Sequence, residues 1–162
     1  MLINLLDNNT DLTEAQELAY RGHNTFMPYL LNQATAALNA DFQLVLRNHG
    51  MTLLHWRVLA FLYETDGLGV SALGRVTNVD QATLSRALTV MQRSGYLERK
   101  PSKTDKRVVE IKILPAGKAQ FEKVLPLAWE IYMRAVRGLS QEEQKTLQNL
   151  LNRIRANCST DP

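Results

Sequence analysis

The feature that most constrains the fold of this chain is a change of pattern at Gly95. Before it, Leu84, Leu88 and Met91 recur at three- and four-residue steps, which predicts an amphipathic helix over residues 80–93. Asp80 is the expected N-cap of this helix, and the expected stop after it is Gly95. After it, apolar and polar residues alternate in YLERK and in RVVEIKIL, with the turn-forming residues PSKTD between them. The sequence therefore predicts a helix that leads directly into an antiparallel hairpin.

Three more helices are predicted upstream of this helix and hairpin. Apolar residues at helical spacing predict one over 28–48, and Thr52 is the expected N-cap of the next, over 53–64. Ser71 is the expected N-cap of a short third helix. Asn78 follows it where the turn needs a positive φ, which Asn tolerates better than most residues. Two helices joined by a short turn and followed by a hairpin describe a winged helix-turn-helix.

Two helices are predicted after the hairpin. Pro115 begins a long helix, and Pro126, which has no N–H to donate, predicts a kink inside it. Ser140 and Glu143 have capping-box spacing at the start of the last helix. Apolar residues line one face of that helix: Leu147, Leu150, Leu151 and Ile154. The short stretch GLG at Gly67–Gly69 is interpreted as a loop.

Composition narrows the class of protein. The 162 residues are 45% hydrophobic and 22% charged, which suits a single globular domain over 1–162. No apolar run is long enough to span a membrane, and the first residues, MLINLL, lack the pattern of a secretory signal. The single cysteine, Cys158, cannot form an internal disulfide, which fits a reducing compartment. We therefore expect a cytoplasmic protein without a membrane partner.

Enzyme signatures are missing from the sequence. His23, His49 and His55 do not have the spacing of metal ligands, so no metal site is expected. The sequence also contains no nucleophile elbow and no phosphate-binding glycine loop. We therefore expect no catalytic residues and no cofactor.

Charge is concentrated in one segment. Residues 86–118 contain nine basic and three acidic residues, a net charge of +6, whereas the whole chain carries +3 and the remainder therefore −3. Such asymmetry indicates either a local surface that binds a polyanion or a solvated charged hairpin.

The helix over 80–93 has an unusual outward face. Solvent-facing helices usually carry Glu and Lys, whereas this one carries short polar groups, an amide and a guanidinium. These groups can reach base edges and phosphates in a major groove. Arg86 could read a guanine or bind the DNA backbone. The outward positions are Gln81, Ala82, Ser85, Arg86 and Thr89, with Thr83 near the border.

The tip of the hairpin supplies a second candidate contact. Lys103, Lys106 and Arg107 flank the turn and could reach an adjacent minor groove, where negative potential is focused. Asp105 lies two residues before Arg107. It could orient the Arg107 guanidinium, or form a surface ion pair that contributes almost nothing.

These segments resemble the MarR family of regulators (multiple-antibiotic-resistance regulators). The resemblance rests on HWRVLAFLYE, DQATLSRALTVMQRSGYLERKPSKTDKR and ILPAGK, in that order and spacing. It implies a dimeric winged-helix transcription factor, in which Thr83, Ser85 and Arg86 contact DNA. It also implies that Arg107 enters the minor groove and that Asp105 orients it. The sequence departs from the family pattern at Asn78, Gly74 and Leu114, where relatives commonly have Gly, Ala and Thr.

The expected fold is mainly α with a small β-hairpin wing. It comprises a winged helix-turn-helix lobe over 52–114 and a helical dimerisation region over 12–48 and 115–157. The apolar stripes of the outer helices would be buried against a second copy, or inside a larger monomeric core. A symmetric dimer would place two copies of the helix over 80–93, one from each subunit, on a pseudo-palindromic operator, as a ligand-responsive repressor does. The alternative is a winged helix that binds protein and not DNA.

The resemblance also implies a small aromatic or phenolic effector bound between the dimer region and the DNA-binding lobe. Several candidates also have structural interpretations: Arg57 could instead form a salt bridge, and His55 could be an ordinary helix histidine. Relatives that sense oxidants use a cysteine in the first helix, where this chain has none. The candidate effector residues are Phe26, Leu30, His55, Arg57 and Tyr132.

Overall fold

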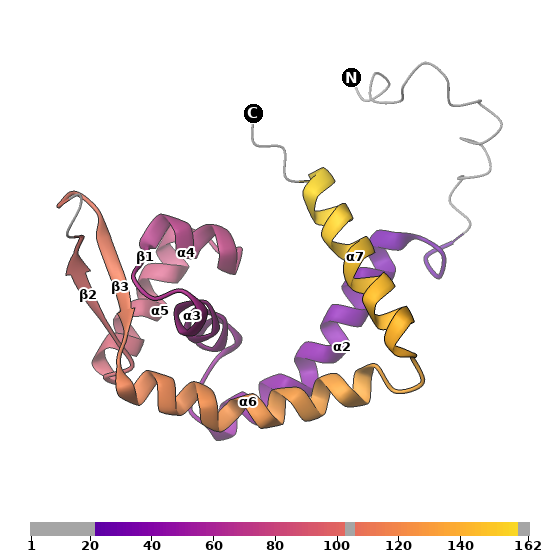
Figure 1. Ribbon diagram of the computed structural model, residues 1–162, viewed down its shortest axis with the longest axis horizontal. Helices are drawn as coiled ribbons and strands as arrows, with labels where there is room; N and C mark the ends of the chain where they lie inside the picture. The colour runs from indigo at the N-terminus through magenta and orange to yellow at the C-terminus, as the bar shows by residue number, and fades with distance from the viewer. Residues whose placement is uncertain (1–21, 103–105, 159–162) are drawn as a thin grey trace, which may run out of the picture. The chain divides into compact units, whose positions relative to one another are not determined.

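The computed structural model describes residues 22–102 and 106–158, which are mostly helical and include one small sheet (Figure 1). The chain divides into two compact units, one ending at Asn39 and the other beginning at Ala40. Among the described residues, no helix is both long and apolar enough to cross a membrane. The elements in chain order are α2 (Met27–Asn48), α3 (Leu53–Glu64), β1 (Leu68–Gly69), α4 (Val70–Thr77), α5 (Gln81–Arg93), β2 (Leu97–Pro101), β3 (Val109–Ile113), α6 (Pro115–Ala135) and α7 (Gln141–Cys158).

The described part of the first unit is a turn followed by the first half of α2. The N–H of Thr25 donates to the carbonyl of Gly22 (3.2 Å). The rings of His23 and Tyr29 meet edge to face, with centroids 5.2 Å apart. α2 begins at Met27, one residue before the predicted start, so the helix predicted over 28–48 is confirmed.

Local side-chain hydrogen bonds cap the starts of three helices in the second unit, α3, α5 and α7. The hydroxyl of Thr52 accepts from the N–H of His55 (3.2 Å) and caps α3, as predicted. Asn78 adopts the predicted left-handed conformation (φ 54°) between α4 and α5. The capping box of α7 is also present, because Ser140 N–H donates to Glu143 Oε2 (2.7 Å) and Glu143 N–H donates to Ser140 Oγ (3.3 Å).

Two predictions between α3 and α5 were wrong. The GLG stretch is not simply a loop, because Leu68 and Gly69 form β1, in which Leu68 pairs with Ile111 of β3. Ser71 is not an N-cap. α4 begins at Val70 with Gly69 as its N-cap and no side-chain capping bond. Pairing with β3 fixes the chain at Gly69, so the helix starts directly from the strand. The hairpin thus becomes a three-stranded antiparallel sheet of order β1-β3-β2.

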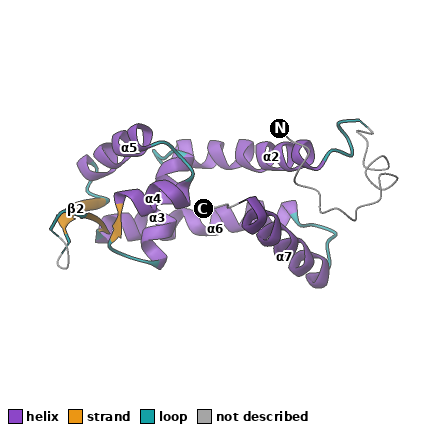
Figure 2. Cartoon of the chain, turned by 90° about the horizontal axis from the view of Figure 1, so that it is seen from above, coloured by secondary structure: helices purple, strands orange, loops and turns teal. Residues whose placement is uncertain are grey.

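One hydrophobic core joins the sheet to α3, α4, α5, the end of α2 and the first half of α6. α3 contacts α4, α5, α6 and β3, and α5 also contacts β2. Figure 2 shows α3, α4 and α5 grouped beside β2. The alternation predicted for the hairpin is confirmed on its inner face. The buried apolar core residues are Leu46, Met51, Val58, Leu59, Leu62, Leu73, Leu84, Leu88, Met91, Leu97, Ile111, Ile113, Phe121 and Val124.

Stacked aromatic rings tie α6 to α3. Trp56 stacks on Phe121 with ring centroids 4.6 Å apart, and it meets Phe42 edge to face at 5.2 Å. Tyr63 lies 4.7 Å from Phe121, and its hydroxyl donates to Oε1 of Glu122 (2.9 Å). Each such pair stabilises by roughly 0.5–1.5 kcal/mol beyond its buried area. The first turns of α6 are therefore held to the winged-helix core.

The start of α6 lies against the beginning of β2. The N–H of Leu114 donates to the carbonyl of Tyr96 (2.9 Å), and Gly117 is buried beside the same carbonyl. A Cβ on Gly117 would lie 2.2 Å from that oxygen. The backbones therefore approach more closely than any side chain allows. Pro126 lies inside α6, as expected, and the kink it implies stays a prediction.

Replacing Leu114 with threonine should stabilise the protein. Leu114 is the N-cap of α6 in extended conformation (φ −93°, ψ 162°) and makes no side-chain capping bond. A hydroxyl there can accept from an unpaired N–H of the first turn, which contributes about 1 kcal/mol. We expect the urea midpoint of Leu114→Thr to rise, with Leu114→Ala as the control that shortens the side chain without adding a cap. A lower midpoint for the threonine variant would mean that the packing of the Leu114 side chain stabilises the fold more than a capping hydrogen bond does.

Candidate nucleic-acid interface

α5 has one buried face and one exposed face, as its sequence predicts. Leu84, Leu88 and Met91 are fully buried and Ala87 is nearly so. Of the six predicted DNA-contact positions, Thr89 is half-buried and the others are exposed: Gln81, Ala82, Thr83, Ser85 and Arg86. The structure therefore brings the six residues together on one helix and places five of them in contact with solvent.

Asp80 caps this helix through Thr83. Oδ1 of Asp80 accepts from the N–H of Thr83 (2.9 Å), and Oδ2 accepts from the Thr83 hydroxyl (2.7 Å). The hydroxyl of Thr83 thereby uses its only proton within the protein, and the Thr83 N–H, one of the N–H groups of the first helical turn, is occupied as well. Thr83 can still accept a hydrogen bond from DNA, but it cannot donate one in this conformation.

The cap makes the stability of α5 sensitive to acid. Hydrogen bonds from Thr83 hold the pKa of Asp80 below its ordinary value of 3.8. Because the folded pKa is depressed, ionised Asp80 stabilises the fold fully above its unfolded pKa and loses this effect as pH falls through the folded value. Asp80→Asn keeps an acceptor but does not titrate. In urea titrations below about pH 4, its free energy of unfolding should fall less steeply than that of the wild type. Equal slopes would contradict this account.

Thr89 and Ser85 are linked to a residue of the hairpin that the sequence analysis did not single out. The hydroxyl of Thr89 donates to the carbonyl of Ser85 (2.9 Å). Nη2 of Arg99, on β2, donates to the same carbonyl (3.1 Å) and to the Thr89 hydroxyl (3.2 Å). The period of two in a strand places Arg99 on the same face as buried Leu97, and this parity could have pointed to the contact.

The other face of the hairpin is electrically neutral. Glu98 pairs with Lys112 across the strands, and Lys100 pairs with Glu110, so that unlike charges stand opposite one another. Within each strand, Lys100 also forms a salt bridge with Glu98, and Lys112 lies 3.8 Å from Glu110. The excess positive charge of the segment therefore lies outside this quartet. Its described carriers are Arg86, Arg93, Arg99, Lys106, Arg107 and Lys118.

The described part of the wing tip is exposed. Lys106 and Arg107 lie in the turn that leads into β3, and both are open to solvent. Lys103 and Asp105 lie outside the described residues. The orienting role expected of Asp105 therefore stays a prediction, while the exposure of Arg107 is compatible with a minor-groove contact.

The five candidate effector residues are distributed over both units. Phe26 and Leu30 are exposed in the first unit. His55, Arg57 and Tyr132 are half-buried in the second, where burial lowers the pKa of His55 and the Tyr132 hydroxyl donates to Gln144 (3.2 Å).

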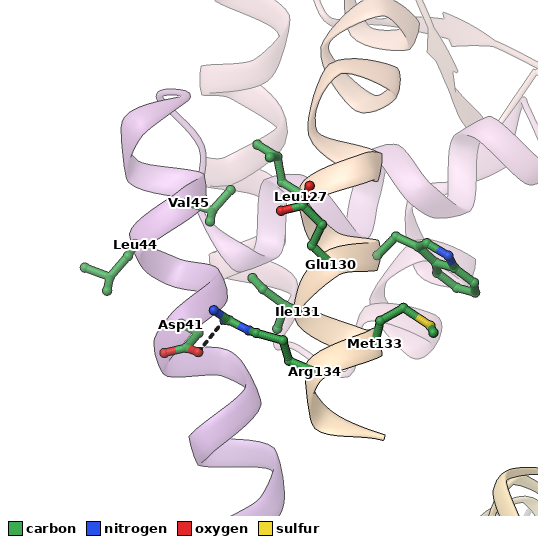
Figure 3. Close-up of a pocket in the computed structure, with 9 residues that line it drawn as sticks. Asp41, Leu44, Val45, Leu127, Glu130, Ile131, Met133 and Arg134 are labelled. Carbon is green, nitrogen blue, oxygen red and sulfur yellow. Dashed lines mark hydrogen bonds and ion pairs between the residues drawn. The ribbon is translucent and has the colours of Figure 1, made fainter. Parts of the chain in front are cut away.

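A cavity of about 630 Å³ lies between α2 and α6 within the second unit (Figure 3). Its mouth carries an ion pair between Arg134 and Asp41 (2.7 Å), and most of its wall is apolar. Of the five candidate effector residues, none lines this cavity in the described structure. Its lining residues are Asp41, Leu44, Val45, Leu127, Trp129, Glu130, Ile131, Met133 and Arg134.

Metal chemistry finds no support in the described residues. In residues 22–102 and 106–158, no three His, Cys, Asp or Glu side chains lie close enough together to hold a metal ion. The surface that combines polar groups with positive charge is instead the outer side of α5 and the wing.

A helix-turn-helix whose second helix exposes short polar groups beside a basic hairpin defines a winged-helix DNA-binding protein. The MarR family model matches residues 49–108, which span α3 to the wing. A MarR-family regulator from Silicibacter pomeroyi is 28% identical, has a TM-score of 0.79, and aligns over 93% of this chain and 98% of its own. The chain belongs to the MarR family of DNA-binding transcriptional regulators.

Two further relatives extend the comparison. A probable transcriptional regulator from Pseudomonas aeruginosa is 33% identical, with a TM-score of 0.71, over 81% of this chain and 98% of its own. The transcriptional repressor IacR of Pseudomonas putida is 22% identical over 94% of this chain and 99% of its own length. The similarity thus extends beyond the winged helix to the flanking helices.

Proposed function

We propose that this protein is a sequence-specific transcriptional repressor that binds a pseudo-palindromic operator as a homodimer, rather than an enzyme. The observation that carries the proposal is the exposed face of α5, where Gln81, Ser85 and Arg86 present an amide, a hydroxyl and a guanidinium. These groups match the donor and acceptor pattern of base edges in the major groove. The wing residues Lys103, Asp105, Lys106 and Arg107 would reach the neighbouring minor groove.

Exposed apolar side chains on the two outer helices support the homodimer. Trp129 is 61% exposed and Met133 53%, both on α6. Isolated monomers rarely leave so many large apolar groups in water, and a symmetric interface would bury them. We assign the dimerisation region to 12–48 and 115–157 and the DNA-binding lobe to 52–114. The apolar residues of α7 that would join the interface are Leu147, Leu150, Leu151 and Ile154.

DNA binding over a range of salt concentrations tests the proposal. Duplexes selected from a random pool should bind with log K falling by roughly 0.9 for each phosphate contact as log salt rises. The selected sequences should contain inverted half-sites about one turn of DNA, roughly 34–36 Å, apart. Sedimentation equilibrium should give the mass of a dimer. A monomer that ignores every duplex at low salt would contradict the proposal and favour a winged helix that binds protein.

We further propose a small aromatic or phenolic acid as the effector that releases the operator. Ligand pockets commonly enclose roughly 300–1,000 Å³, and the cavity between α2 and α6 lies in this range. Arg134 at its mouth could exchange Asp41 for the carboxylate of such a ligand. Calorimetry with benzoate and salicylate should detect binding to the wild type and not to Arg134→Ala. Binding to both proteins would instead indicate an effector site at His55, Arg57 and Tyr132.

The cellular location is proposed from the role of the family. A regulator of transcription acts in the compartment that holds the chromosome, so we propose that the protein works in the cytoplasm.

A further inference from the structure

Arg99 joins the base of the wing to α5. Its Nη2 lies 3.1 Å from the carbonyl of Ser85 and 3.2 Å from the hydroxyl of Thr89. That hydroxyl also donates to the Ser85 carbonyl (2.9 Å), so the three groups form a closed set of hydrogen bonds. The set lies on the face of α5 that was expected to contact DNA, and it includes two of the predicted contact residues.

The donor and acceptor count changes what Thr89 can do. A threonine hydroxyl has one proton, and here it is given to Ser85. Arg99 donates to the same oxygen, which places a positive charge beside it. Thr89 is only half-buried, yet its hydroxyl is occupied on both sides. Its polar group therefore fits a partner for Arg99 better than a reader of bases.

The position of Arg99 in the sheet explains why this contact matters. Leu97 and Arg99 share the face of β2 that meets α5, and Leu97 is fully buried. Glu98 and Lys100 share the opposite face, within the neutral quartet. Besides apolar packing and the backbone turn that joins α5 to β2, a charge-assisted hydrogen bond therefore links the wing to α5, and such a bond is stronger than a neutral one.

We propose that Arg99 is a positioning residue for operator binding and that Thr89 acts through it. The inference rests on the proposed DNA-binding function. Two neighbouring grooves of DNA have a fixed separation, so α5 and the wing can enter both only if their relative orientation is held. Arg99 holds it by fixing β2 to the Ser85 carbonyl and the Thr89 hydroxyl.

The test is a double-mutant cycle on operator affinity. Thr89→Val removes the hydroxyl and keeps the shape and charge, and Arg99→Met removes the guanidinium. Each change should raise Kd for a duplex selected by the wild type by roughly tenfold, as expected for a hydrogen bond with a charged donor. Because both residues act through one contact, the double variant should be no weaker than Arg99→Met. Thr89→Ser, which restores the hydroxyl, should bind as the wild type does.

An unselected duplex and circular dichroism provide the controls. Thr89→Val leaves the net charge unchanged, so its affinity for the selected duplex should fall more than its affinity for the unselected one, to which general attraction to phosphates contributes most. Circular dichroism at the assay temperature should show that every variant is folded. If Arg99→Met does not fold, Thr89→Val alone still tests the inference.

Three outcomes would overturn the inference. Additive losses would show that Thr89 contacts DNA independently of Arg99. Unchanged specific affinity in Thr89→Val, with a wild type that binds, would exclude the positioning role and leave the proposed function intact. A wild type that binds neither duplex would overturn both.

Discussion

Replacing Gly117 with alanine should destabilise the fold by roughly 1–3 kcal/mol, the range expected when a well-packed interior is overfilled. The new Cβ would lie 2.2 Å from the carbonyl oxygen of Tyr96 and 3.0 Å from its carbon. Neither atom belongs to a flexible side chain. Moving this carbonyl away would also lengthen the hydrogen bond that it accepts from Leu114. Urea denaturation followed by circular dichroism should show the loss as a lower midpoint.

Gly74→Ala is the matched control, because the same change should have the opposite sign there. A Cβ on Gly74 would meet Leu84 Cδ2 at 3.7 Å and the Val79 carbonyl at 3.9 Å, which are ordinary contact distances. Gly74 lies inside α4, where alanine is favoured over glycine by about 0.5–1 kcal/mol. If both variants were destabilised equally, then neither helix propensity at Gly74 nor the close backbone approach at Gly117 would determine the effect of alanine.

Arg107→Ala should weaken operator binding by about a hundredfold or more without lowering the stability of the fold. A specific arginine contact is worth roughly 1–3 kcal/mol, and a symmetric dimer would lose it twice. Arg107 is exposed in the turn before β3 and is not part of the hydrophobic core. Fluorescence anisotropy with a labelled, selected duplex measures the loss, and thermal unfolding measures the stability.

Lys145→Ala controls for the loss of one positive charge. Lys145 is exposed on α7, and on a helical wheel it faces away from Leu147, Leu150 and Leu151. We expect its operator affinity to change little and its sedimentation to remain that of the wild type. An equal loss in both variants would mean that net charge, and not the wing contact, determines affinity.

The elements that the sequence predicted are those that short-range chemistry determines. The caps at Thr52, Asp80 and Ser140 each bond to the third residue onward, and the positive φ of Asn78 follows from its place between two helices. The stop at Gly95 (φ 71°) and the inward positions of α5 follow in the same way from turn chemistry and helical period. The MarR resemblance added the expected DNA contacts, which remain predictions.

What the sequence did not predict depends on contacts between distant residues. β1 has only two residues, too few for alternation to be visible, and it exists because Leu68 pairs with Ile111 of β3. The prediction that Ser71 is an N-cap was wrong, because that pairing fixes where α4 begins. The hydrogen bonds of Arg99 and the close approach at Gly117 likewise join parts of the chain whose proximity no local pattern reveals.

The two tryptophans of this chain stand in very different surroundings. Trp56 is half-buried and packs against Phe42 and Phe121, whereas Trp129 is 61% exposed and stacks only on Tyr132 within the described residues, at 4.9 Å. Their emission should therefore separate into a blue component from Trp56 and a red one from Trp129. In the proposed dimer Trp129 would be covered, so its emission should shift to the red as dilution separates the subunits, whereas the emission of Trp56 would follow the integrity of the lobe. The protein thus carries two intrinsic optical reporters, and Trp129→Phe would isolate the first of them.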